Sequence, residues 1–151
     1  MRPAHAAQLL AAGQPAEIWE WMPTRPISAE TVDAWLATAM QAESHGREYP
    51  FIVVRLSDSL VIGSTRYLDV QQDDRTVEIG WTWYTPEAWG GMVNPEAKYL
   101  LMRHAFATAA AEGAEKLSLA VDAANAPALA LYRRHNMHQL CARLALIREL
   151  R

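Results

Sequence analysis

Three stretches of the chain carry the apolar and β-branched patterns of strands. Residues 51–54 form a continuous apolar run, which is typical of a buried strand, and β character returns over 60–70 and 75–84. Short polar turns separate the three stretches, so we expect an antiparallel meander. Gly63, inside the second stretch, predicts a bulge or a close approach of another chain segment.

Apolar residues at helical spacing predict three helices. The first covers 4–12 and ends at a glycine. The second begins with a cap at Ser28 and ends near 45–46, and its apolar positions indicate one buried face. The third covers 94–112.

The rest of the chain predicts more of both elements. A strand at 116–121 follows the helix 94–112 and would lie parallel to the strand 76–84, because a β-α-β unit joins parallel strands by a right-handed crossover. The fold class is therefore mixed α/β (α+β), with a largely antiparallel sheet. The remaining elements are a helix over 125–136 and two closing strands at 138–141 and 144–150.

Composition narrows the class of protein. A chain of 151 residues fits a single domain over 1–151 with one core. The net charge of −3, without a long Lys/Arg block, argues against a nucleic-acid binder. The single cysteine, Cys141, fits a reducing cytoplasm, and no apolar run approaches the roughly 18 residues of a membrane span. We therefore expect a cytoplasmic protein without nucleic-acid or membrane partners.

The stretch 77–98 combines a strand, a glycine-bearing loop and a helix start. Gly90 and Gly91 interrupt the strand pattern, and Asn94 then caps the helix with Pro95 in the first helical position. The first N–H groups of a helix have no partner inside it, and the helix dipole places partial positive charge there. We therefore expect an anion site at this loop.

The order of elements and several motifs resemble the GNAT superfamily of acyl-CoA-dependent N-acetyltransferases. The segments 61–67 and 78–83 are similar to the branch related to ribosomal-protein N-terminal acetyltransferases. The loop 89–94, Trp-Gly-Gly-Met-Val-Asn, falls where that family cradles the pyrophosphate of coenzyme A, and 125–137 resembles a later motif with an Asn and a Leu-Tyr pair. The resemblance covers roughly 50–140 and implies a GNAT-like sheet with helices on both faces.

The resemblance also implies a reaction. An acetyl group would pass from acetyl-CoA to a primary amine by direct attack in a ternary complex, and the acceptor would be a small molecule or a peptide or protein N-terminus. The alternative, from another class, is a catalytically degenerate acyl-CoA-binding or protein-interaction module with the same fold. Pairing of exposed final strands would allow a homodimer.

Two residues are candidates for catalysis. Glu78, inside a strand with apolar neighbours, is the candidate general base, because burial would raise its pKa. Its alternative role is an outward-facing carboxylate paired with Arg66. Tyr132 takes the place of the family tyrosine that protonates the coenzyme A thiolate, and its alternative is a core aromatic. The resemblance implies an acetyl-CoA site of Trp83, Tyr84, Trp89, Gly90, Gly91, Met92, Val93, Asn94 and Asn125, the last of which could also be a helix cap.

Alternation along the third strand assigns its side chains to two faces. Glu78, Gly80 and Thr82 should share one face, and Trp81 and Trp83 the other. The apolar face must pack on a helix, so we expect Trp81 in the core.

Two features depart from the family pattern. Met92 takes the place of the second motif glycine, so its side chain must point away from the phosphates or block them. Only Met1-Arg2-Pro3 precedes the first helix, so the family's first strand is expected to be truncated or absent.

The histidines carry no metal signature. No pair has helical i, i+4 spacing together with a carboxylate, so we expect no metal site. The five histidines are His5, His45, His104, His135 and His138.

The acceptor pocket has no readable signature. We expect its walls to come from the 19–26 loop, the helix after Ser28 and the end of the chain. Trp19, Trp21 and Met22 are expected to pin that loop against the core, with a pocket wall as the alternative.

Overall fold

The computed structural model describes residues 1–20, 22, 27–71, 73, 76–111, 129–130 and 133–134. The chain divides into two compact units, Met1–Glu112 and Gly113–Arg151. In the second unit, 129–130 and 133–134 are helical, within the predicted helix 125–136. The predicted strands 116–121, 138–141 and 144–150 lie outside the described residues.

The first unit contains helices on either side of a small sheet. Its elements in chain order are η1 (Pro3–His5), α1 (Ala6–Ala12), η2 (Ala16–Trp19), α2 (Val32–Ser44), β1 (Tyr49–Arg55), β2 (Leu60–Gln71), β3 (Thr76–Tyr84), η3 (Pro86–Ala88) and α3 (Val93–Ala111).

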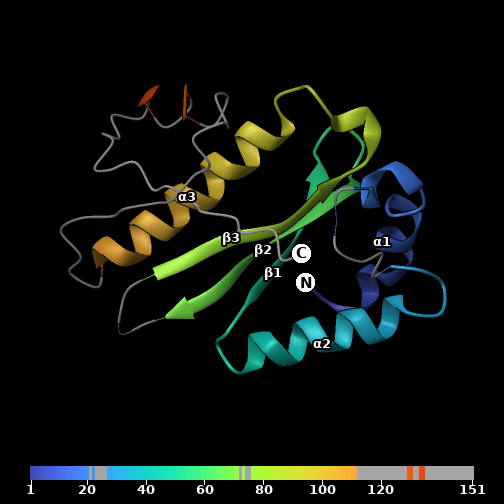
Figure 1. Ribbon diagram of the computed structural model, residues 1–151, viewed down its shortest axis with the longest axis horizontal. Helices are drawn as coiled ribbons and strands as arrows, with labels where there is room; N and C mark the ends of the chain where they lie inside the picture. Colours follow the sequence, from blue (N-terminus) through green and yellow to red (C-terminus); the bar gives the residue numbers. More distant parts are fainter. Residues whose placement is uncertain are drawn as a thin grey trace, which may run out of the picture. The chain divides into compact units, whose positions relative to one another are not determined.

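The sheet has the order β1-β2-β3, and both neighbouring pairs are antiparallel, which confirms the predicted meander. Helix α3 covers one face, and α1 and α2 pack against the other (Figure 1). The hydroxyl of Tyr67 in β2 donates to the backbone carbonyl of Leu101 and ties α3 to its face. No strand precedes η1 in the described part of the chain. There the Met1 amino group donates to the Pro50 carbonyl at 3.0 Å.

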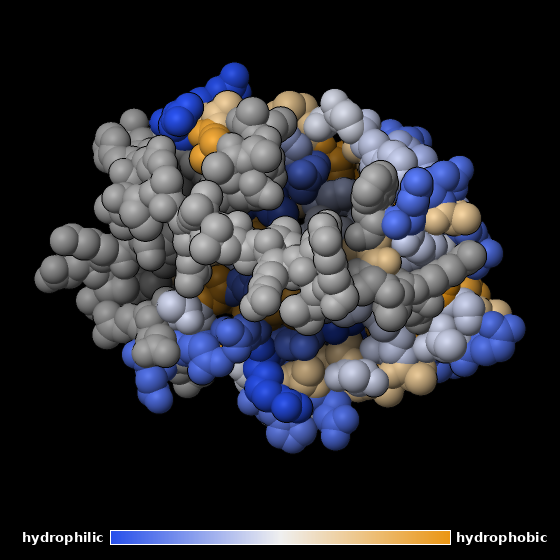
Figure 2. Space-filling view, viewed as in Figure 1, coloured by the Kyte–Doolittle hydropathy of each residue, from blue (hydrophilic) through white to orange (hydrophobic). Residues whose placement is uncertain are grey.

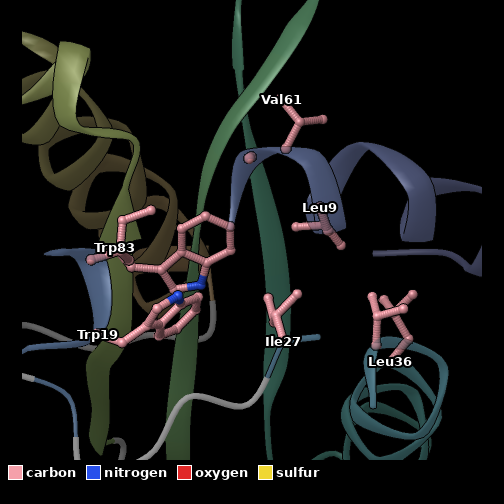
Figure 3. Close-up of a cluster of buried hydrophobic side chains, with 9 residues drawn as sticks. Leu9, Trp19, Ile27, Leu36, Val61 and Trp83 are labelled. Atoms are coloured by element: carbon pink, nitrogen blue, oxygen red, sulfur yellow. The ribbon is translucent and has the colours of Figure 1, made fainter. Parts of the chain in front are cut away.

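The face beneath α1 and α2 holds the main hydrophobic core (Figure 3). Leu9 is fully buried and Leu36 is 2% exposed, and each buried side chain of this size contributes roughly 1.5–3 kcal/mol. The Trp19 and Trp83 rings pack at a tilt with centroids 5.3 Å apart, and Trp19 Nε1 donates to the Gly13 carbonyl at 2.9 Å. Trp19 therefore belongs to the core, as expected.

Gly63 confirms the predicted close approach between strands. A Cβ atom there would lie 2.3 Å from the carbonyl oxygen of Trp83 and 2.8 Å from the Tyr84 ring. Only a residue without a side chain lets β2 and β3 pair at the end of β3.

A bulge in β3 corrects the predicted assignment of its side chains. Ser64 pairs with Trp83, but Arg66 pairs with Gly80, so two β3 residues stand opposite one β2 residue. Trp81, in the bulge, has a φ of +47°. Its ring is only half-buried, 5.8 Å from the Arg66 guanidinium, so the prediction that Trp81 lies in the core was wrong.

The bulge moves Thr82 to the opposite face from Gly80. Thr82 Oγ1 accepts a hydrogen bond from Lys98 of α3, whereas Gly80 pairs with Arg66, whose guanidinium lies 4.7 Å from the ring of Trp35 in α2. The predicted sharing of one face by Glu78, Gly80 and Thr82 was therefore wrong. One extra residue shifts the alternation by one position.

The start of α2 also differs from the prediction. The helix begins at Val32 with Thr31 at the cap position, and Ser28 lies one turn earlier. The Ser28 carbonyl accepts a hydrogen bond from the Val32 N–H at 3.0 Å. The Ser28 hydroxyl donates to the Glu30 carboxylate at 2.7 Å. The Ser28 side chain therefore stabilises the turn before the helix rather than the helix end.

The outer surface of α2 is mixed, because its exposed residues include Asp33, Thr38 and Gln41 but also Ala34 and Ala37. In Figure 2, hydrophilic side chains in blue alternate with more apolar ones in tan along the lower edge of the view. Within the described residues, no helix combines the length and the apolar character needed to cross a membrane.

Candidate functional site

A pocket of about 360 Å³ lies where β3 ends and α3 begins, and we call it the glycine-loop pocket. Its wall combines Thr82 and Tyr84 of β3, the loop Trp89–Gly91, and Asn94 and Lys98 of α3. It thus brings together two strand residues and the loop and helix start that were singled out from sequence.

The loop backbone is open on its outer side. Gly90 has a φ of +70°, and a Cβ atom at Gly90 or Gly91 would meet no other atom within 4 Å. Met92 is 72% exposed and does not line the pocket. The Met92 side chain therefore turns to solvent and leaves the loop backbone uncovered.

Helix α3 begins one residue earlier than predicted. Val93 is its first residue, so Asn94 lies inside the first turn instead of capping it, and the Met92 carbonyl accepts from the Glu96 N–H at 2.9 Å. Pro95 is still tolerated, because the first-turn N–H that it lacks would have no partner within the helix. The positive end of the helix dipole faces this loop.

Tyr84 links the end of β3 to the helix start. Its hydroxyl donates to Asn94 Oδ1 at 3.3 Å, which explains why the Asn94 side chain does not cap the helix. Burial raises the pKa of Tyr84 to about 12, so the phenol stays protonated at neutral pH. The indole Nε1 of Trp89, a side chain that is 50% exposed, donates to the Tyr84 carbonyl at 2.8 Å.

Lys98 is a site residue that sequence reasoning missed. Its Nζ donates to Thr82 Oγ1 at 2.9 Å, and that hydroxyl lies 2.8 Å from Thr65 Oγ1. Burial lowers the pKa of Lys98 to about 8, while the charge of Glu78 acts in the opposite direction. Its spacing of four residues from Asn94 places both on one helix face, a signal that could have revealed it.

Glu78 is exposed on β3, so the burial expected from its apolar neighbours was wrong. The alternative of an outward-facing strand carboxylate agrees with this exposure, but its pairing with Arg66 was wrong, because the ion pair of Arg66 is with Glu48, at 2.8 Å. The apolar neighbours of Glu78 in sequence do not enclose its side chain. Whether Glu78 acts as a base stays a prediction.

Two other candidates, Tyr132 and Asn125, lie outside the described residues, as do His135 and His138. Among the residues described, no group of His, Cys, Asp and Glu is placed to hold a metal ion.

A second pocket, of about 190 Å³, adjoins the first, and we call it the apolar pocket. Ile18 and Met22 form its wall on the side of η2. Met22 also packs against the core cluster, as expected, and its contact with substrate stays a prediction. Trp21 lies outside the described residues. The remaining lining residues are Thr82, Trp83, Tyr84 and Trp89.

Comparison with known proteins agrees with this architecture. Residues 1–138 match the sequence profile of the acetyltransferase (GNAT) domain family. A sequence search of curated proteins gave no match.

Several solved structures share the fold. A GCN5-related N-acetyltransferase from Brucella melitensis is 21% identical with a TM-score of 0.60, over 69% of this chain and 48% of that one. RimJ of Mycobacterium smegmatis in complex with CoA-disulfide is 21% identical with a TM-score of 0.61, over 88% and 65%. A structure described as a candidate ribosomal-protein-serine acetyltransferase from Vibrio cholerae is 15% identical with a TM-score of 0.64, over 89% and 74%. The matched region thus spans about half of the Brucella chain and about two thirds of the RimJ chain.

Proposed function

Because the chain belongs to the GNAT acetyltransferase family, among the acetyl-CoA-dependent N-acetyltransferases, we propose that it transfers the acetyl group of acetyl-CoA to a primary amine by direct attack in a ternary complex. The amine belongs to a small molecule or to a peptide or protein N-terminus. The observation that supports this proposal is the glycine-loop pocket, with its uncovered backbone and its partly buried lysine.

The residues of this pocket fit the pyrophosphate of coenzyme A. Gly90 and Gly91 leave room for an anion against the backbone, and the N–H groups of Met92, Val93 and Asn94 lie at the start of α3. In our proposal Lys98 adds a positive charge deeper in the same pocket. The peptide groups of Trp83 and Tyr84 would hold the pantetheine arm as an added strand does.

Bound acetyl-CoA supplies the thioester whose carbonyl carbon the amine attacks, with loss of the thiol. The protein must orient the two substrates, take a proton from the amine and provide one to the thiolate. Glu78 is exposed to water on β3 and can take the proton directly or through a water molecule. In our proposal the Tyr84 amide donates to the oxyanion, Tyr132 provides the proton for the thiolate, and Asn125 contacts the pantetheine arm.

Two features support the alternative of a degenerate binding module: Met92 in the phosphate loop and the missing first strand. The first no longer supports it, because the Met92 side chain is 72% exposed and does not block the loop. The second stays, because no strand precedes η1 in the described part of the chain. The enzyme is the proposal that we carry forward.

Calorimetric titration with acetyl-CoA tests the site, using Gly91→Asp as the variant. The added Cβ atom meets no other atom within 4 Å, and the carboxylate would repel the phosphates, so binding should fall at least tenfold. Ser57→Asp, in the exposed turn between β1 and β2, is the matched control and should bind as wild type does. Absence of binding at millimolar acetyl-CoA would overturn the proposal.

Turnover is tested separately by thiol release with a panel of primary amines. Release that depends on the amine supports the enzyme. Binding of acetyl-CoA without release from any amine would support the module instead.

A further inference from the structure

We propose that the apolar pocket receives the substituent of the acceptor amine, and that this substituent is a compact apolar group, an aromatic ring or a branched alkyl chain. The inference rests on the proposed function and narrows the class of acceptor. It assigns to Met22 and Ile18 the selection of the substrate.

The position of the apolar pocket supports this role. It shares Thr82, Tyr84 and Trp89 with the glycine-loop pocket, so molecules bound in the two would be neighbours. An acetyl acceptor must sit beside the thioester end of the donor. Trp83 and Tyr84, whose peptide groups hold the pantetheine arm in our proposal, also line the apolar pocket, so a molecule bound there would lie beside the arm that carries the thioester.

The chemistry of the described walls favours an apolar group over a cationic chain in this pocket. Among the described residues, none that lines this pocket carries a charge, and Ile18 and Trp83 are only 6% and 3% exposed. A second ammonium group would lose its hydration here without gaining a carboxylate, which is strongly unfavourable. An apolar group gains free energy by leaving water for the same walls.

The size of the pocket suits one side-chain-sized group. Its volume of about 190 Å³ is below the roughly 300–1,000 Å³ of pockets that enclose whole drug-sized ligands. Dry apolar cavities of about 150 Å³ in other proteins accept a benzene ring. A phenyl or branched alkyl group therefore fits, and the rest of a larger acceptor would remain outside.

Met22 is the wall residue best suited to a test. It is half-buried and packs against the core cluster of α1 and α2 without belonging to its fully buried set. Its unbranched thioether adapts to apolar ligands, and replacement is less disruptive there than at Ile18.

The experiment compares kcat/KM for phenethylamine, isoamylamine and putrescine at saturating acetyl-CoA. Wild type should prefer the two apolar amines by roughly tenfold or more. Met22→Glu should reverse this preference by lowering the apolar amines and raising putrescine. Leu56→Glu adds the same charge at a turn position that is 91% exposed, and it should leave the preference unchanged.

Met22→Phe is a second variant, which tests the pocket without introducing a charge. By filling the pocket it should lower kcat/KM for phenethylamine at least tenfold while ethylamine is little affected.

Equal use of putrescine by wild type, or a preference that neither Met22 variant alters, would overturn the inference. Acetyl-CoA titration separates the two failures: loss of donor binding or of all turnover in wild type refutes the proposed function, whereas normal turnover with the wrong preference refutes only the acceptor class.

Discussion

Lys98 of α3 donates from Nζ to the hydroxyl of Thr82 in β3 at 2.9 Å, inside the glycine-loop pocket. Burial lowers the pKa of Lys98 to about 8, so its charge changes in a pH range where the protein can be studied. Ligand binding and stability should therefore both depend on pH. As the pH rises, ligand binding should weaken and stability should increase.

Lys98→Met should weaken acetyl-CoA binding roughly tenfold at pH 7, about 1.4 kcal/mol, because a cation beside the phosphates is lost. Wild-type affinity should itself fall as the pH rises through about 8, and the variant should lack this dependence. Calorimetry at pH 7 and pH 9 measures both effects. Arg103→Met removes a cation from the exposed surface of the same helix and is the control; equal affinities of the two variants would contradict the prediction.

The same substitution should stabilise the fold at neutral pH. The folded pKa of about 8 lies below the ordinary value of 10.5, so the unfolded chain binds more protons between these values and stability rises with pH there. Below pH 8 the partly buried ammonium of Lys98 costs roughly 1–2 kcal/mol after allowance for solvent screening. Urea unfolding should find Lys98→Met more stable than wild type by this amount at pH 7, with the difference lost near pH 10.5. A stability difference that stays constant across this pH range would show that the ionisation of Lys98 is not its cause.

Gly63→Ala should destabilise the protein by about 1–3 kcal/mol, because the added Cβ would lie 2.3 Å from the Trp83 carbonyl oxygen and force β2 and β3 apart. Gly91→Ala is the matched control, since its Cβ meets nothing within 4 Å, and its stability should stay within about 0.5 kcal/mol of wild type. Thermal and urea unfolding compare the two. Similar losses in both variants would show that steric contact at Gly63 is not the cause.

Arg66→Met should cost about 2–3 kcal/mol of stability. Arg66 is 6% exposed, pairs with Glu48 at 2.8 Å and lies 4.7 Å from the ring centroid of Trp35, so its loss leaves a partly buried carboxylate without its partner. Adding Glu48→Gln removes that charge and should recover part of the loss. The double-variant cycle by urea unfolding measures the coupling, and additive effects would contradict it.

Local patterns were sufficient for most of the fold in the first unit. The antiparallel meander, the helices around it and the close approach at Gly63 follow from hydrophobic spacing, short turns and glycine, which act over a few residues. Helix starts were displaced at Ser28 and Asn94, because each side chain found a partner outside the helix end.

The bulge at Trp81 was not predictable from β3 alone. It arises from the register between two strands, with Ser64 opposite Trp83 and Arg66 opposite Gly80. A pattern of alternation within one strand contains no information about its partner. For this reason the sequence placed Trp81 in the core and Thr82 on the same face as Gly80, and both predictions were wrong.

By itself, the sequence determined that a strand, a glycine-bearing loop and a helix start follow one another over 77–98, and that they resemble an acetyl-CoA site. Only the tertiary structure decided that Met92 turns to solvent, that Lys98 reaches Thr82, and that Met22 walls a second pocket. The physical reason is that glycine, proline and helix caps act on neighbouring backbone, whereas a pocket depends on side chains that packing brings together from distant parts of the chain.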